Sequence, residues 1–210
     1  MTEPTEGPRR PGPIGGDMAA IVFGLTARFR LDALTQRHSS TAVLGLFAFV
    51  NGLIAIGIMA AVALITGDPF IFPSLGPTAF LLFYTPMAPA SSPRNTVLGH
   101  AIGAAAGYLA LVVFGLTDAA PALASEVTGG RVGAAALSLG LTSGAMAWAK
   151  VPHPPAGATT LIVSLGILRE PEQLVVLMVA VVLLVGQGLV INRLAGIPYP
   201  LWRAAPPASP

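Results

Sequence analysis

The strongest constraint on this chain is a central stretch, residues 38–192, in which only nine side chains are charged. The remaining eleven charges lie in residues 1–37 and 193–210. Charged residues make up 10% of the chain, whereas a soluble domain carries about 25%. Because so few charges cannot cover a surface that faces water, the stretch predicts an all-α, polytopic membrane helix bundle. The same composition excludes a disordered chain, a nucleic-acid binder and an ordinary soluble enzyme.

Composition divides the chain into four parts. Residues 1–17 are rich in proline and glycine and predict a disordered tail. Residues 18–37 combine an apolar face with several arginines, which predicts either an amphipathic helix on the cytoplasmic membrane surface or a solvated helix. Residues 38–195 form the transmembrane domain, and residues 196–210 are expected to be a cytoplasmic tail. The chain contains no cysteine, so disulfides and thiolate chemistry are excluded.

Four apolar segments are long enough to cross a bilayer, namely 43–66, 97–117, 131–149 and 173–192. In the second segment, Gly99, Gly103 and Gly107 are spaced four residues apart, which allows another helix to approach closely. The default interpretation of this spacing is packing within the bundle, and the alternative is a dimer seam.

Two further apolar segments, 69–86 and 151–168, begin with proline-rich stretches that predict extended backbone followed by a helix of about ten residues. Such backbone is tolerated at membrane depth only where protein buries it or where it lines a wet cavity. The two segments match each other at an offset of 81 residues: Pro73 with Pro154, Gly76 with Gly157, and Thr78 with Thr159.

The chain therefore contains the same arrangement twice, over residues 43–117 and 131–192. Each part consists of a membrane span, a broken helix and a second span. Interrupted segments at matching places in two halves indicate a transporter site. Six crossings place nine basic residues inside and two outside, whereas four crossings place eight inside and three outside. The positive-inside rule therefore favours six crossings, an inverted repeat and two cytoplasmic termini, with four crossings as the open alternative.

Three short motifs resemble the HPP family of integral membrane proteins. They are HPPAGATT from His153, SSPRNTVLGH from Ser91 to His100, and SLGPTA from Ser74. The resemblance covers about residues 40–195. It implies a small bacterial or plastid membrane protein, usually described with four transmembrane helices, and some relatives in cyanobacteria and chloroplasts are associated with nitrite transport.

The polar groups expected at membrane depth are mostly hydrogen-bond donors. No Asp or Glu lies within a predicted span, which argues against a carboxylate proton relay or a cation site. Each short helix points its N-terminus, with about half a positive charge, at its own break, and this favours an anion. Glycines at the breaks are expected to let the ligand approach the backbone. The predicted substrate-binding residues are Ser74, Gly76, Thr78, His153, Gly157, Thr159 and Thr160.

Four more residues, Asn51, Arg94, Asn95 and His100, are assigned to the pathway or its gating, each with a structural alternative. Asn51 can join two helices by a hydrogen bond. Arg94 and Asn95 can cap a helix and anchor to head groups, and His100 can lie at the interface. His153 either binds the anion or changes protonation during transport, or else it satisfies carbonyls freed by the prolines.

The sequence thus predicts a transporter or channel for a small monovalent anion, with nitrite the best candidate through the resemblance. The alternatives are a non-transporting assembly or sensory module, and a channel or carrier for a small neutral solute. Enzyme activity, metals and other cofactors are not expected, because two histidines without an acidic partner make no metal site and no nucleophile elbow or phosphate loop is found. The expected partners are the lipid bilayer of a bacterial inner membrane, the anion, and a second copy of the chain in a homo-oligomer.

Overall fold

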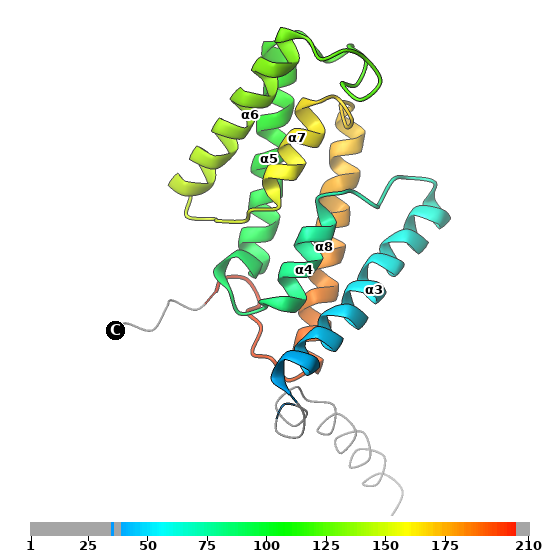
Figure 1. The fold of residues 1–210 in the computed structure, drawn as a ribbon, viewed down its shortest axis with the longest axis vertical. Helices are drawn as coiled ribbons and strands as arrows, with labels where there is room; N and C mark the ends of the chain where they lie inside the picture. The colour runs from blue at the N-terminus through cyan, green and yellow to red at the C-terminus, as the bar shows by residue number, and fades with distance from the viewer. Residues whose placement is uncertain (1–34, 36–38, 205–210) are drawn as a thin grey trace, which may run out of the picture.

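The computed structural model describes Thr35 and residues 39–204, and this part of the chain is helical (Figure 1). Residues 1–34, 36–38 and 205–210 lie outside the described residues, so the expected tail, the surface helix and the end of the second tail stay predictions. The helices are α3 (Ser40–Thr66), α4 (Leu75–Tyr84), the 3-10 helix η1 (Pro89–Ser91), α5 (Pro93–Val113), α6 (Gly129–Trp148), α7 (Ala156–Ser164) and α8 (Pro171–Leu194).

Four of the described helices, α3, α5, α6 and α8, are long and apolar enough to cross a membrane. They coincide with the four segments expected from the sequence. Helix α5 begins with Pro93 after Ser92, whose hydroxyl accepts a hydrogen bond from the N–H of Asn95. Helix α8 begins in a similar way, with Pro171 in its first turn.

The two short helices lie where the proline-rich segments predicted them. Helix α4 has ten residues and α7 has nine, and each follows an extended or turning segment, 67–74 and 149–155. Ten residues of helix are about 15 Å long, which is about half of a bilayer's hydrocarbon core. Neither short helix therefore crosses a membrane by itself.

The direction of the chain reverses at each connection between these helices. Helices α3, α5 and α7 run one way, and α4, α6 and α8 run the other way (Figure 1). Hydrogen bonds show which termini share an end. The N–H of Arg94, at the start of α5, donates to the carbonyl of Trp202 beyond α8, and its side chain donates to the carbonyl of Lys150 beyond α6. At the other end, the side chain of Arg131, in the first turn of α6, donates to the carbonyl of Ser164 at the end of α7.

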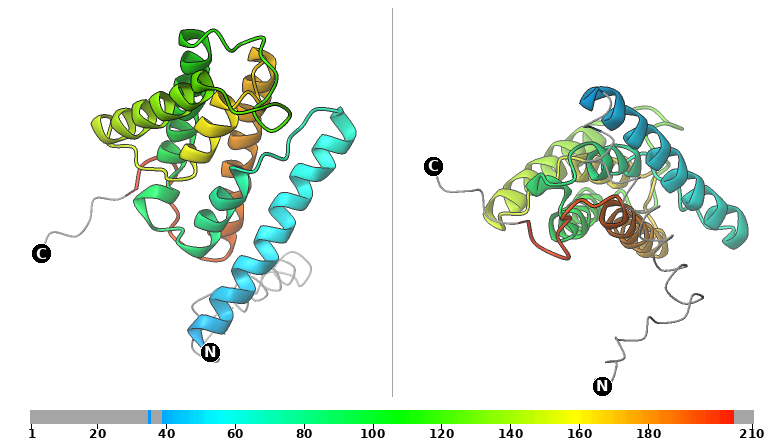
Figure 2. Two further views of the ribbon diagram at one scale, coloured as in Figure 1. Left: turned by 45° about the horizontal axis from the view of Figure 1, so that its top comes forward. Right: turned by 90° about the horizontal axis from the view of Figure 1, so that it is seen from below.

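Each short helix packs against two long ones. Helix α4 contacts α3 and α8, whereas α7 contacts α6 and α5, and α5 also packs against α6 and α8. Helix α3 lies at one edge of the bundle (Figure 2). Its outward side chains are apolar, with Leu53 and Phe49 each about two-thirds exposed (64% and 67%), as expected for a surface that faces lipid.

The glycine stripe of α5 is the surface on which α7 packs. A β-carbon at Gly103 would lie 2.6 Å from the carbonyl oxygen of Ala156, and one at Gly107 would lie 2.7 Å from Cβ of Val163. The contact is therefore possible only without side chains on this face. Packing within the bundle is confirmed, and the alternative of a dimer seam is wrong for this stripe because α7 covers it.

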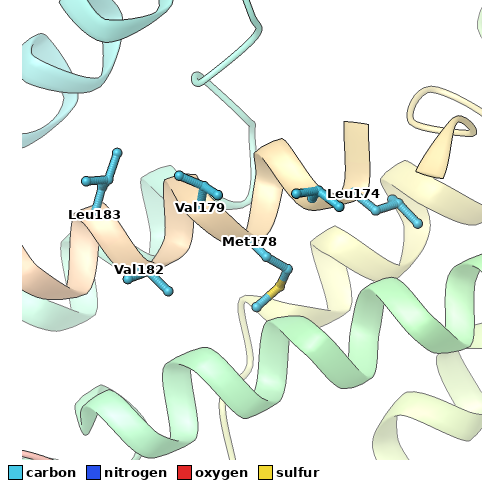
Figure 3. Close-up of a pocket in the computed structure, with 6 residues that line it drawn as sticks. Leu174, Met178, Val179, Val182 and Leu183 are labelled. Carbon is cyan, nitrogen blue, oxygen red and sulfur yellow. The ribbon is translucent and has the colours of Figure 1, made fainter. Parts of the chain in front are cut away.

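An apolar recess of about 480 Å³ runs along one side of α8 (Figure 3). Its lining contains no polar side chain, so it offers a ligand no hydrogen bond and suits a lipid chain. The lining residues are Leu174, Val175, Met178, Val179, Val182 and Leu183.

Candidate functional site

Four buried polar side chains meet inside the bundle, and we name them the His–Thr cluster: Thr78 of α4, His100 of α5, His153 before α7, and Thr159 of α7. All four are completely buried. Thr78 Oγ1 lies 2.9 Å from His100 Nε2 and 3.3 Å from His153 Nε2. The two Nε2 atoms are 3.2 Å apart, and His100 Nδ1 lies 2.7 Å from Thr159 Oγ1. The cluster thus joins both short helices to α5.

Local sequence explains how these side chains reach one another. Thr78 and Thr159 lie in the first turns of α4 and α7, so both short helices point their N-termini toward the cluster. His153 lies in the segment just before α7, which the following prolines keep out of the helical conformation. Its ring packs over Gly99, where a β-carbon would lie 2.7 Å from the β-carbon of His153.

Hydrogen bonding assigns the proton positions on His153. Its Nδ1 lies 2.7 Å from the carbonyl oxygen of Ala90, which can only accept. Nδ1 therefore carries the hydrogen and donates it to Ala90. In the neutral ring, Nε2 is then an acceptor that faces His100.

The proton on His100 follows from its two threonine neighbours. The hydroxyl of Thr78 donates to the carbonyl of Ser74 at 2.9 Å, so its oxygen accepts from His100 Nε2–H. His100 Nδ1 is then an acceptor for the hydroxyl of Thr159. In this neutral arrangement, the one hydrogen on His100 Nε2 lies between two acceptors, Thr78 Oγ1 and His153 Nε2, which share it.

Uptake of a proton would change this arrangement. A hydrogen on His153 Nε2 would point at the N–H of His100, 3.2 Å away, so the two rings would have to separate or reorient. The cluster contains no carboxylate that could balance the added charge, and a buried unpaired charge is costly. The acidic residues of 39–204 occupy the segments between helices or the start of α8. A bound anion would supply the missing negative charge.

Two predicted site residues lie next to the cluster but not in it. Thr160 faces α6, where its Oγ1 lies 2.7 Å from Thr142 Oγ1, and it also donates to the carbonyl of Ala156. Ser74 is completely buried, and its hydroxyl has no hydrogen-bond partner among the described residues. Ser74 therefore leaves one free polar group one turn before Thr78.

The structure places Gly76 and Gly157 away from the His–Thr cluster, so the expected approach of a ligand to the backbone there stays a prediction. Gly76 is exposed, and a β-carbon there would meet nothing within 4 Å. At Gly157 a β-carbon would make an ordinary contact, 3.5 Å from a methyl group of Leu139. Each glycine precedes its threonine by two residues, which is about 200° around a helix. The glycines therefore face away from the cluster that Thr78 and Thr159 enter.

Two of the four proposed pathway residues cap helices or make local bonds. The side chain of Asn51 donates to the carbonyl of Phe47 in its own helix, and within the described part of the chain it makes no bond to another helix. The guanidinium of Arg94 donates to the carbonyls of Ala149 and Lys150 at the end of α6. Arg94 therefore caps a helix, which is the structural alternative that the sequence offered to a role in the pathway.

The other two pathway residues differ from each other. Asn95 donates from its side chain to the carbonyl of Pro89, which fixes the turn before α5. His100 lies in the cluster and is completely buried in the bundle. Sequence reasoning missed Ala90, which acts through its backbone carbonyl and has no side-chain signal that could reveal it.

The long apolar helices, together with a buried polar cluster at their centre, define a multi-pass membrane protein. Its sequence matches the family model described as "HPP, transmembrane region" over residues 36–200, and the chain belongs to the HPP family.

Two proteins of Dictyostelium discoideum, each named as a transmembrane protein, are similar to part of the chain. One is 38% identical over 93 residues, which is 44% of this chain and 27% of that protein. The other is 33% identical over 94 residues, which is 45% of this chain and 30% of that protein. The matched part thus spans less than a third of either relative. No solved structure matches the chain.

Proposed function

We propose that this protein is a transporter or channel for a small monovalent anion, with nitrite the best named candidate, and that the anion binds at the His–Thr cluster. One observation carries the proposal: both broken helices bring a threonine to the same pair of buried histidines. Ionisable residues at membrane depth are costly and mark substrate or ion pathways. A site formed by interrupted helices from two halves is typical of transporters.

The charges around the cluster favour an anion over a cation. The cluster has no carboxylate, and two helix N-termini, each with about half a positive charge, point toward it. The hydroxyl of Ser74 is free to donate. Once the histidine pair takes up one proton, a ligand with a single negative charge would neutralise the site. The cluster therefore favours a monovalent anion.

Six crossings in an inverted repeat support transport, and two observations favour this arrangement. The chain reverses direction between each pair of successive α-helices from α3 to α8 (Figure 1). The contacts also correspond between halves: α4 packs against α3 and α8, as α7 packs against α6 and α5.

A pair of contacts reproduces the offset of 81 residues that relates the two broken segments. Each contact joins the two halves: Val163 of α7 faces Gly107 of α5, and Leu82 of α4 faces Gly188 of α8. Adding 81 to Leu82 gives Val163, and adding 81 to Gly107 gives Gly188. The same offset thus describes a sequence match and a spatial contact, which favours two equivalent halves over four spans with re-entrant segments.

The cluster is closed to solvent in this structure, so binding needs a conformational change. Separation of a short helix from the long helix that it packs against would open the cluster toward one end of the bundle. An anion that stabilises inward-open and outward-open states differently would then shift their populations.

The second candidate is a membrane module that transports nothing. One observation favours it: all four ring nitrogens of the cluster lie within 3.3 Å of a protein hydrogen-bonding atom, with no ligand present. In that case the histidines would hold the short helices in place.

Uptake into proteoliposomes separates these candidates. Nitrite influx is measured against competing nitrate, formate and chloride, at neutral and acidic pH and with the membrane voltage clamped. We expect voltage-dependent influx that His153→Gln weakens, most strongly at acidic pH, where imidazole gains a proton. The control is His38→Gln, which removes a histidine that precedes α3 in the sequence.

Three outcomes would contradict the proposal. Absence of anion influx at normal protein abundance would favour the non-transporting module. Influx of a neutral solute without voltage dependence would favour the solute channel. A folded His153→Gln variant with unchanged affinity at both pH values would remove His153 from the site.

A further inference from the structure

Four helices of the bundle end in the same backbone motif, in which a residue with positive φ follows the helix cap. The next N–H then bonds to a carbonyl five residues back, as in a Schellman motif. The residues with positive φ are Gly115 after α5, Lys150 after α6, Gly166 after α7 and Gly196 after α8. The matching bonds join Leu116 to Leu111, Val151 to Met146, Ile167 to Ile162, and Ile197 to Asn192.

Lys150 is the exception in this set, with φ of 53°. Glycine adopts this conformation without steric cost, whereas a β-carbon approaches the neighbouring carbonyl oxygen. The end of α6 therefore tolerates strain that the ends of three other helices avoid. Strain of this kind points to a use for the side chain that causes it.

The surroundings of Lys150 indicate what that use is. An open recess of about 510 Å³ reaches from Lys150 to His153, whose ring belongs to the His–Thr cluster. No acidic side chain lines this recess. Its lining residues are Ser143, Met146, Ala147, Lys150, Pro152, His153 and Pro154.

Arg94 makes this end of α6 more favourable to an anion. The last carbonyls of a helix carry partial negative charge and would repel an anion. Here the carbonyls of Ala149 and Lys150 accept hydrogen bonds from the guanidinium of Arg94, at 3.3 and 3.1 Å. Within residues 39–204 neither Arg94 nor Lys150 pairs with a carboxylate, since the ion pair found there joins Arg169 to Glu170. Lys150 thus lines the recess as a cation without a carboxylate partner, and Arg94 is bonded to the backbone of the same helix end.

We propose that Lys150 draws the transported anion into this recess and that the recess is its route to the His–Thr cluster. The inference rests on the proposed function for the identity of the anion. A phosphate of a lipid head group has the same charge and could bind the same ammonium group, so the test must separate the two sources.

The sequence offers a direct test, because Lys150 is the single lysine of the chain. In detergent without phospholipid, a small amine-acylating reagent would modify Lys150 and the N-terminal amine, and mass spectrometry of the peptides distinguishes them. We expect millimolar nitrite to slow labelling of Lys150 several-fold. The control is gluconate at equal ionic strength, which screens charge equally but is too large for the route.

Two variants at Lys150 extend the test to transport. Lys150→Gly removes both the charge and the strain, so we expect a higher thermal midpoint together with several-fold slower nitrite influx at low concentration. Lys150→Arg keeps the charge and should keep the rate. Arg203→Gln removes an exposed charge just beyond Trp202, at the same end of the bundle, and should leave the rate unchanged.

The outcomes separate this inference from the proposed function. Equal labelling in nitrite and gluconate, or an unchanged rate in Lys150→Gly, would overturn the role of Lys150 while transport stands. If Lys150→Gly slowed nitrite influx only in vesicles with anionic lipid, Lys150 would be assigned to binding lipid head groups. That result would also overturn its role in drawing in the anion. Protection by nitrite without any influx would support the anion site and refute transport.

Discussion

Replacement of Gly103 by alanine tests the closest helix contact in the bundle. The new β-carbon would lie 2.6 Å from the carbonyl oxygen of Ala156 and 2.9 Å from Oγ1 of Thr160. The carbonyl belongs to the first residue of α7 and cannot rotate away, so α7 must shift as a unit. A shift of α7 also disturbs the 2.7 Å contact between Thr159 and His100 in the cluster.

The size of the effect follows from a matched control, Gly186→Ala in α8. A β-carbon at Gly186 meets nothing within 4 Å. Both variants gain helix propensity of about 1 kcal/mol, so the difference between them isolates the cost of overpacking, about 1–3 kcal/mol. For a domain of this size, each kcal/mol corresponds to a shift in thermal midpoint of about 2–4 °C.

Thermal unfolding in a mild detergent, followed by circular dichroism at 222 nm, measures this difference. We expect Gly103→Ala to unfold at a lower temperature than Gly186→Ala and to lose anion influx in proteoliposomes. Equal midpoints for the two variants would refute the contact between α5 and α7, and with it the geometry of the cluster.

Two further predictions concern a buried cation and the membrane topology. At Gly166, with φ of +80°, a β-carbon would lie 2.7 Å from Nη2 of Arg131, so Gly166→Ala should lower the thermal midpoint more than Gly115→Ala, which has a positive φ but no atom within 4 Å. We expect overpacking to add about 1–3 kcal/mol at Gly166, and equal losses would show that backbone strain accounts for both. Single cysteines at Ala149 and Ser125, both exposed in a chain without cysteine, are expected to react with an impermeant thiol reagent from the inside and the outside, respectively. Reaction of Ala149 from the outside and of Ser125 from the inside would contradict six crossings and favour four.

Length and hydropathy were enough to predict the four long helices, because a helix that faces lipid must be apolar over its whole length. The prolines before Leu75 and Ala156 likewise predicted two short helices after extended backbone. The glycines of α5 predicted a close contact but not its partner. Sequence spacing describes one helix at a time, and the partner of a bare helix face depends on the tertiary fold.

The candidate site was predicted in part. Thr78, Thr159 and His153 were selected because they lie at the breaks, and the structure brings them together with His100. The glycines at the breaks were selected for the same reason, but a helix places residues two apart on nearly opposite sides. A sequence match locates a segment, and the helical period decides which of its residues face inward.

In the proposed repeat, the two halves correspond in packing but differ in chemistry. At the offset of 81 residues, His153 corresponds to Phe72 and His100 corresponds to Val181, and both counterparts are apolar and buried. The threonines recur in both halves, yet the ionisable groups occur once. Phe72 and Val181 show that apolar side chains are accommodated at the corresponding places. If the repeat only stabilised the bundle, apolar side chains at the positions of His153 and His100 would be sufficient. Within residues 39–204, the histidine pair therefore gives the proposed repeat a single polar site that its two halves share.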